Sequence, residues 1–266
     1  GRVGCGALGC WSYVIGARRN VSLSVNRAIA LLGFGALSYA APFALYALGQ
    51  QHIGAGVAGI VNATTPAFAV IVSHFWPGGA RATFLKSLGV VCGFAGIVVL
   101  SLPVLHSGAG SQFWAILLIL LAPVCYAFSV NFARAFRDMQ PVVLVALALT
   151  GATLAITPLA LWQEGVPHVT RVETWASLLM IGFVLTSAAF IVFYWLLPKV
   201  GPTNISTVTL IAPVSALVLG TWVLGETLRP EHLLGMAAIL AGLLLIDGRL
   251  IRRLRRSAEV KDQPKG

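Results

Sequence analysis

The feature that most limits how this chain can fold is a segment that occurs twice. The first copy runs from Gly54 to Leu100 and the second from Gly201 to Ile246. The two copies share glycine, proline and small-residue positions at an offset of 147 residues, with a slip of one residue in their second halves. The matched pairs are Gly54 with Gly201, Val61 with Val208, Pro66 with Pro213, Ala69 with Ala216, Gly78 with Gly225, Gly89 with Gly235 and Gly96 with Gly242. Such self-similarity in an apolar chain is typical of an internally duplicated membrane protein.

Composition supports a membrane protein. Hydrophobic residues make up 58% of the chain and charged residues only 10%, with a mean hydropathy of +0.89. A soluble fold of this length could not bury so much apolar surface. The net charge of +10 could indicate a nucleic-acid partner, but seven of the 18 Lys and Arg residues lie from Arg249 onward and most others lie in short connections. This distribution is typical of membrane topology, so no nucleic-acid partner is expected.

Apolar stretches of about 20 residues recur along the chain, as expected for helices that cross a bilayer. The first, Gly1 to Ala17, is only moderately apolar and ends at two arginines. Eight clearer spans follow, with boundaries good to about three residues. They are predicted at Ala28 to Gly49, Ala55 to Trp76, Phe84 to Pro103, Gln112 to Phe132, Pro141 to Leu161, Trp175 to Leu197, Pro202 to Leu224 and Glu231 to Leu250.

Basic residues sort these connections into two sets. Alternate connections and the C-terminal tail hold 15 Lys and Arg residues on one side, against two on the other. The positive-inside rule therefore predicts a cytoplasmic C-terminus. The span with Pro66 and the span with Pro213 then cross in opposite directions, so the two repeats are inverted. Because the copies are offset by five spans, we expect two five-helix repeats, of which nine helices are present and the first, before Gly1, is missing.

The upstream residues extend the repeat at an offset of 148, where Tyr46 matches Tyr194. With the duplicated prolines and the stretch GETLRPEHLLGMAAILAGLLLI, the chain resembles the EamA-like ten-helix members of the drug/metabolite transporter superfamily. The first repeat departs from the pattern, because Gly79 stands where the second has Glu226. The resemblance implies an all-α polytopic membrane protein with a first repeat at 1–104, a second at 112–250 and a basic tail at 251–266. It also implies a secondary exporter in a bacterial inner membrane.

The duplicated prolines indicate where a solute would pass. Proline in a helix removes a donor and frees the carbonyl four residues earlier, so Pro66 should leave that of Asn62 unpaired and Pro213 that of Thr209. Unpaired carbonyls should face protein or water rather than lipid. Small or polar residues continue both faces at helical spacing: Gly59, Asn62, Pro66, Ala69 and Ser73 in one copy, and Ser206, Thr209, Pro213, Ala216 and Gly220 in the other.

The pathway interpretation competes with a simpler one, in which small residues only let helices approach closely. We favour the pathway because packing alone does not require a proline and a polar side chain at equivalent sites. The residues predicted to line it are Asn62, Thr65, Pro66, Tyr46, Tyr126, Tyr194, Ser206, Thr209 and Pro213. Trp11, Tyr39 and Asn131 could complete the cavity, although each could equally be a packing or interface residue.

The chemistry of the chain favours transport over catalysis. All eight acidic residues fall in connections, at span ends or in the tail, so a charged substrate would lack a counter-ion at the midplane. A neutral, zwitterionic or apolar small molecule is therefore the expected substrate. No HExxH or GxSxG motif is present, and the four cysteines form no CxxC pair, so no enzyme activity, metal or cofactor is predicted. A non-transporting or degraded membrane protein stays the main alternative, ahead of an intramembrane enzyme.

Two partners besides a small-molecule substrate are predicted for the chain. The basic tail from Arg249 onward is expected to bind anionic lipid headgroups. The sequence also leaves open a homodimer.

Overall fold

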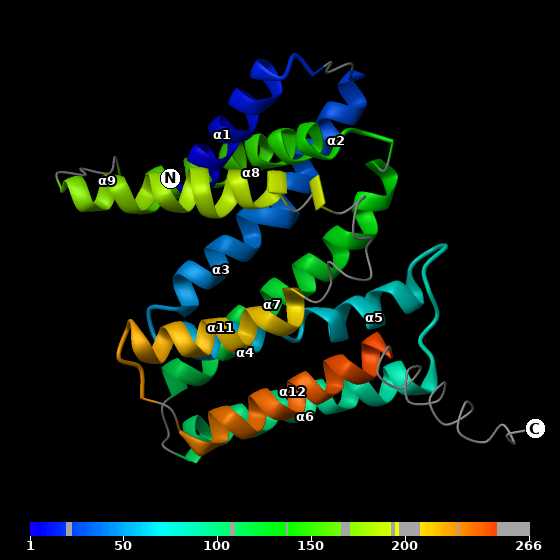
Figure 1. Ribbon diagram of the computed structural model, residues 1–266, viewed down its shortest axis with the longest axis vertical. Coiled ribbons are helices and arrows are strands. Elements are labelled where there is room, and N and C mark those ends of the chain that lie inside the picture. The colour runs from blue at the N-terminus through cyan, green and yellow to red at the C-terminus, as the bar shows by residue number, and fades with distance from the viewer. Residues whose placement is uncertain are drawn as a thin grey trace, which may run out of the picture. The chain divides into compact units, whose positions relative to one another are not determined.

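The structure is a computed structural model and describes residues 1–19, 23–106, 110–136, 138–165, 171–192, 195–196, 208–227 and 229–248. Every regular element in these ranges is a helix (Figure 1). Seven of the described helical segments are long and apolar enough to cross a membrane. They are Val25–Gly49, Ala55–Phe75, Phe84–Pro103, Gly110–Phe136, Pro141–Trp162, Val172–Val192 and Pro230–Asp247. The all-α polytopic architecture predicted from sequence is confirmed.

Two shorter helices account for the remaining predicted spans. Helix α1 covers Arg2–Gly16. Helix α11 covers Val208–Trp222, and the residues before it lie outside the described ranges. Large apolar side chains point outward from many helices, including Phe84 with 85% and Trp222 with 89% of its surface exposed. Hydrocarbon surroundings explain such exposure more readily than water does.

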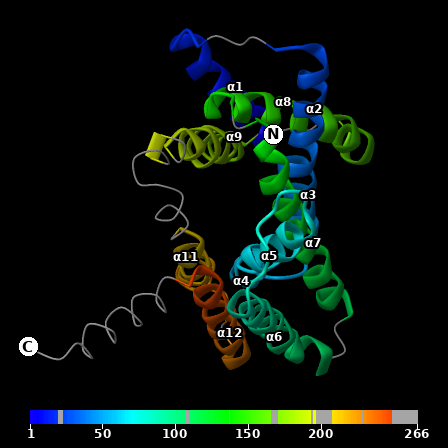
Figure 2. The same cartoon turned by 90° about the vertical axis from the view of Figure 1, so that its right-hand side faces the viewer.

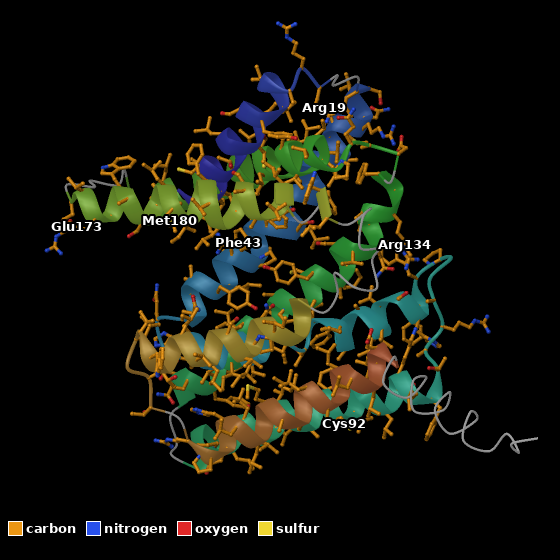
Figure 3. The ribbon with its side chains drawn as sticks, in the orientation of Figure 1. Arg19, Phe43, Cys92, Arg134, Glu173 and Met180 are labelled. Atoms are coloured by element: carbon orange, nitrogen blue, oxygen red, sulfur yellow. The ribbon has the colours of Figure 1, made fainter. Side chains whose placement is uncertain are left out.

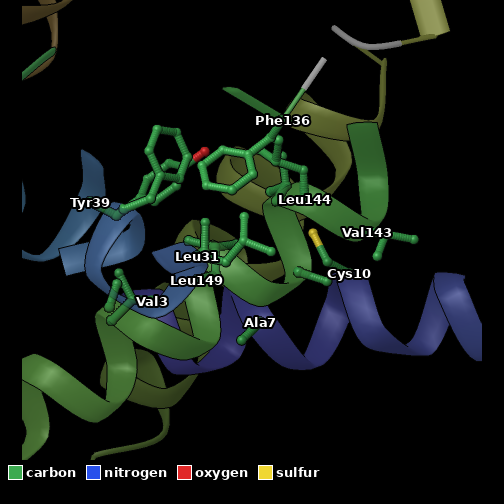
Figure 4. Packing of buried hydrophobic residues seen from close by; sticks show 14 of the residues in the cluster. Val3, Ala7, Cys10, Leu31, Tyr39, Phe136, Val143, Leu144 and Leu149 are labelled. Atoms are coloured by element: carbon green, nitrogen blue, oxygen red, sulfur yellow. The ribbon is translucent and has the colours of Figure 1, made fainter. Parts of the chain in front are cut away.

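The chain divides into two compact units, and each draws on both halves of the sequence. The first unit comprises Gly1–Ala44 and Phe132–Thr207. It contains α1, α2 (Val25–Gly35), α8 (Pro141–Glu164) and α9 (Val172–Leu179). Side chains from α1, α2 and α8 meet in one apolar cluster that includes Cys10, Leu31 and Leu149 (Figure 4).

Two segments of this unit are π-helical, and the repeat relates them. The segment η1 covers Ala36–Ala40 and leads into α3 (Ala41–Gly49), whereas η3 covers Met180–Ala188 and follows α9. At the offset of 148, η1 falls on the second half of η3. In η3 the hydroxyls of Thr186 and Ser187 donate to carbonyls five residues earlier, at 2.8 and 3.2 Å. Such widened turns are rare and concentrate at functional sites.

The second unit comprises Leu45–Asn131 and Val208–Gly266. Its helices are α4 (Ala55–Asn62), α5 (Thr65–Phe75), α6 (Phe84–His106), α7 (Gly110–Phe132, nearly all of it), α11 and α12 (Pro230–Asp247). Helix α6 packs along α12, and α4 packs along α11 (Figures 1 and 2). In the first pair a helix packs against its own counterpart in the other repeat. In the second pair α4 packs against α11, which is the counterpart of α5, the helix that continues the span of α4.

The α6–α12 pair shows the geometry of an inverted duplication. A Cβ atom on Gly89 would lie 2.5 Å from the Gly242 carbonyl oxygen, and one on Gly242 would lie 2.5 Å from that of Gly89. Gly96 and Gly235 approach each other in the same reciprocal way, at 2.7 and 2.8 Å. The sequence match makes Gly235 the counterpart of Gly89 and Gly242 the counterpart of Gly96. In the structure the contacts are exchanged: Gly89 touches Gly242, and Gly96 touches Gly235. Only antiparallel helices related by a local two-fold axis produce this exchange, as in an isologous interface.

One ion pair supports the sorting of the connections into two faces. Arg27 at the start of α2 contacts the Asp138 carboxylate before α8, within the first unit. Both residues lie in connections that the count of basic residues assigns to the same face. The two side chains are 37% and 58% exposed, so the pair adds little to stability.

Candidate functional site

The predicted pathway residue Pro66 lies at a break between two helices rather than inside one. Helix α4 ends at Asn62, Ala63 and Thr64 form a turn, and Pro66 occupies the first turn of α5. The Asn62 carbonyl, which the proline ring deprives of its backbone donor, accepts a hydrogen bond of 2.7 Å from the Thr65 hydroxyl. The prediction that this carbonyl is unpaired is therefore wrong. A threonine hydroxyl replaces the missing N–H locally, which is common where proline interrupts a membrane helix.

This hydroxyl gives a direct test of the break. Replacing Thr65 by valine keeps the shape of the side chain but leaves the Asn62 carbonyl without its donor. We expect a loss of about 1–3 kcal/mol in stability, which is the cost of an unsatisfied polar group in an apolar environment. Thr65→Ser keeps the hydroxyl and should retain most of the stability. Equal melting temperatures for the valine and serine variants in detergent would contradict this role of Thr65.

The break packs closely against neighbouring helices of the same unit. Thr64 is 1% exposed, and the turn lies against Gly89 and Gly93 of α6 and Leu243 of α12. Asn62, Thr65 and Pro66 are each partly buried. The turn at the break thus lies against protein, while Asn62, Thr65 and Pro66 keep part of their surface exposed.

The second copy of this region is described only in part. Pro213 is buried within α11. Thr209 belongs to α11 by its backbone, but its side chain lies outside the described part of the chain, as do Ser206 and Tyr194. Their predicted roles therefore stay predictions.

Part of the small-residue face serves helix packing. A Cβ atom on Gly59 would overlap the methyl group of Ala216, and one on Gly56 would lie 3.4 Å from the Leu217 side chain. Gly59 and Ala216 thus let α4 and α11 pack closely, as the simpler interpretation proposed. Beyond the contact of Gly59 with Ala216, the chain continues with the polar residues Asn62 and Thr65 instead of small ones.

Two predicted tyrosines come together in the second unit. Tyr46 on α3 packs against the apolar cluster around α4 and lies close enough to Tyr126 on α7 to interact with it electrostatically. The Tyr46 hydroxyl is buried and has no hydrogen-bond partner among the described residues. Buried hydroxyls usually have one, so Tyr46 has donor and acceptor capacity available for a solute.

The additional cavity candidates have structural partners. Trp11 donates from its indole nitrogen to the Thr150 hydroxyl at 2.9 Å, and Tyr39 packs edge-on against Phe43 and Phe190. Asn131 donates to the Ala127 carbonyl at 2.9 Å, while its buried amide oxygen has no partner within the described ranges.

Glu226 makes a contact that was not predicted from the sequence. Its carboxylate accepts from the backbone nitrogens of Ala55 and Gly56, at 2.5 and 2.9 Å, and so caps the N-terminus of α4. Backbone amides at a helix start favour a carboxylate both by hydrogen bonding and through the helix dipole. Cβ atoms on Gly54, Gly56 or Gly220 would lie within 2.7–2.8 Å of this carboxylate. Gly54 and Gly56 lie about 170 residues before Glu226 in the sequence, so nothing in the sequence indicated that they meet the carboxylate.

A metal site has no support in the described residues, where no three His, Cys, Asp or Glu side chains are grouped to hold an ion. Apolar helices packed in pairs, each pair joining the two copies of an inverted duplication, define a class of polytopic membrane proteins that includes many secondary transporters. The family is now evident: the chain belongs to the EamA-like transporter family, whose model matches residues 2–102 and 113–247.

Individual relatives agree with this membership. The chain is 26% identical to the inner membrane transporter YedA of Escherichia coli K12 over 74% of its own length and 63% of that protein. It is 24% identical to a transporter of Archaeoglobus fulgidus, over 75% and 70%. The same identity links it to a probable terminal-alkyne amino-acid exporter of Streptantibioticus cattleyicolor, over 84% and 74%. A solved crystal structure shares the fold, with a TM-score of 0.64 and 17% identity over 92% of this chain and 85% of that one.

Proposed function

We propose that the chain acts as a secondary transporter that exports small neutral or zwitterionic molecules, such as metabolites, amino acids or drugs, by alternating access. The observation that carries this proposal is the α4–α5 break, where partly buried polar groups interrupt a membrane span in a member of a transporter family. Interrupted helices in inverted repeats supply substrate sites in many carriers. The relative named as an amino-acid exporter supports amino acids as one substrate class.

The proposed pathway uses polar groups from both repeats. The Asn62 amide and the Thr65 hydroxyl lie at the break, and the unpartnered Tyr46 hydroxyl lies in the same unit as both. Such groups could replace water around a neutral or zwitterionic solute, whereas a solute with net charge would lack a buried counter-ion. The remaining proposed pathway residues are Pro66, Tyr126, Tyr194, Ser206, Thr209 and Pro213.

The expected result of Asn62→Leu is a fall of about tenfold in transport efficiency, since one lost hydrogen bond to a solute corresponds to about 1–1.5 kcal/mol. Export of labelled zwitterionic amino acids can be followed from proteoliposomes containing the full chain. Asn26→Leu is the matched control, because Asn26 is exposed near the start of α2. Full transport by the Asn62 variant, at an unchanged melting temperature, would exclude Asn62 from the pathway.

The proposed orientation has the C-terminus in the cytoplasm of a bacterial cell, with the tail on anionic lipid. The basic residues from Arg249 onward lie outside the described part of the chain. A homodimer also stays a prediction.

A further inference from the structure

A pocket of about 660 Å³ lies within the second unit, where α4 and α12 begin. Its volume falls in the range typical of small-molecule sites. The floor is apolar and includes Val57, Leu100 and Ile116, of which the last two are 1% and 2% exposed. The rim is polar and open to solvent, with His52, Arg229 and His232 among its residues. None of these residues belongs to the pathway predicted from sequence.

The charges around the pocket are unevenly compensated. Glu226 lines the pocket, but both of its carboxylate oxygens accept from the start of α4. Its charge is therefore directed at the helix rather than at the pocket. Arg229 forms no ion pair with any described residue. A guanidinium group in a pocket binds a carboxylate strongly, because its parallel N–H groups match the two oxygens.

His232 stands next to Arg229 and adds a second polar group. Its Nδ1 lies 3.5 Å from the Arg229 backbone nitrogen, an arrangement in which the neutral ring carries its proton on Nε2. His232 also interacts electrostatically with Arg229, Glu226 and Glu231. Glu231 does not line the pocket. A solute in the pocket thus meets two nitrogen donors at one rim and an apolar surface below them.

From this arrangement we propose that the pocket binds a carboxylate on a short aliphatic body, with Arg229 and His232 holding the carboxylate and Val57, Leu100 and Ile116 contacting the body. This inference rests on the proposed transport function, for which the pocket would be a loading or release site near the start of α4. An amino acid and a simple short-chain acid share the required chemistry. Binding of either molecule in this pocket requires no counter-ion at the membrane midplane, because the pocket lies at the ends of the helices.

Glu226 is a positioning residue for this site. Its two hydrogen bonds hold residue 226 against the start of α4, and Arg229 follows three residues later in the sequence. Gly225 has a φ of +67°, a conformation that glycine adopts without strain and that turns the chain toward α4. Release of Glu226 would therefore displace Arg229 from the pocket without altering any group that touches the solute.

Three matched probes test the proposal with the full chain in nanodiscs: L-norleucine, hexanoate, which lacks the amino group, and pentylamine, which lacks the carboxylate. Titration calorimetry against empty nanodiscs gives the dissociation constants. Arg229→Gln should weaken norleucine and hexanoate by about 10–100-fold, which is the range for hydrogen bonds to charged groups, and leave pentylamine unchanged. Arg229→Lys should fall between, because a lysine lacks the planar fork. Arg81→Gln, an exposed charge remote in sequence from the pocket, should have no effect.

Each contrary result has a clear meaning. Absence of norleucine and hexanoate binding in the wild type, or unchanged binding in Arg229→Gln, would overturn the carboxylate site. Equal loss for pentylamine would overturn it as well, because the change would then be a general defect of the pocket. If hexanoate binds and norleucine does not, simple acids rather than amino acids occupy the site. Proteoliposome transport measured in parallel separates the two proposals: transport with no role for Arg229 contradicts only the pocket, and binding without any transport contradicts only the transporter.

Discussion

Replacing Gly242 by alanine is expected to lower the melting temperature of the detergent-solubilised protein by about 5 °C. The new methyl group would lie 2.5 Å from the Gly89 carbonyl oxygen and 2.9 Å from the Gly93 nitrogen. Both are backbone atoms of α6, so no side-chain rotation can relieve the overlap and the helices must separate. Overpacking of this kind costs about 1–3 kcal/mol, and each kcal/mol corresponds to about 2–4 °C for a protein of this size.

Gly33→Ala is the matched control, because Gly33 also lies within a membrane helix but a Cβ there meets no atom within 4 Å. Alanine has the higher helix propensity, by up to about 1 kcal/mol, so this variant should melt at the same temperature or slightly above the wild type. The same substitution is thus expected to lower the melting temperature at Gly242 and to keep or raise it at Gly33. Size-exclusion chromatography after stepwise heating measures both. A Gly242→Ala protein as stable as Gly33→Ala would mean that α6 and α12 do not pack through these glycines.

The equivalence of α6 and α12 could be predicted from sequence, because a duplication leaves the same residues at a constant offset. The match of Gly89 with Gly235 and of Gly96 with Gly242 indicated equivalent helices, and the charge count indicated that they run in opposite directions. That the helices also touch, with Gly89 against Gly242, does not follow from the match. Equivalence in a repeat says which residues are alike and not which are neighbours. The contact depends on where the local axis lies, which is a tertiary property.

The π-helical segments show a different limit. Residues 36–40 and 180–188 read as ordinary apolar helix, because one widened turn changes the hydrophobic period too little to detect. The repeat offset of 148 relates the two segments, but that both are π-helical is known only from the structure. Their presence at equivalent places argues that the widened turn is part of the repeat itself rather than a local distortion.

At the candidate site, the sequence located the break but not its chemistry. Proline chemistry identified Asn62 as the residue whose carbonyl loses a donor, and that assignment is correct. The carbonyl is nevertheless paired, because the neighbouring Thr65 hydroxyl reaches it at 2.7 Å. Side-chain rotamers decide such local replacements, and the sequence does not determine them. The predicted spans place Glu226 in a connection, but its hydrogen-bond partners lie about 170 residues away in sequence.

Glu226→Gln is expected to destabilise the protein by about 2–4 kcal/mol, the second large effect. The glutamine oxygen can accept from one backbone N–H, but its amino group is a donor and would oppose the other. The variant therefore loses one hydrogen bond to a charged group, worth about 1.5–3 kcal/mol, and the attraction between the carboxylate and the dipole of α4, worth about 0.3–1 kcal/mol. Thermal melting of the purified protein measures the sum. Glu173→Gln serves as control, since Glu173 lies exposed in the first turn of its own helix, α9 (Figure 3).

A double-mutant cycle with Gly56→Ala distinguishes this specific contact from a general loss of charge. A methyl group on Gly56 would lie 2.8 Å from the Glu226 carboxylate, so Gly56→Ala should displace the carboxylate while leaving its charge intact. Once the carboxylate has left, Glu226→Gln has little further to remove, and the double variant should be only slightly less stable than either single variant. Strict additivity would instead mean that the two residues act independently. In that case Glu226 could not be the group that ties the connection after α11 to the start of α4, and the positioning of Arg229 would need another cause.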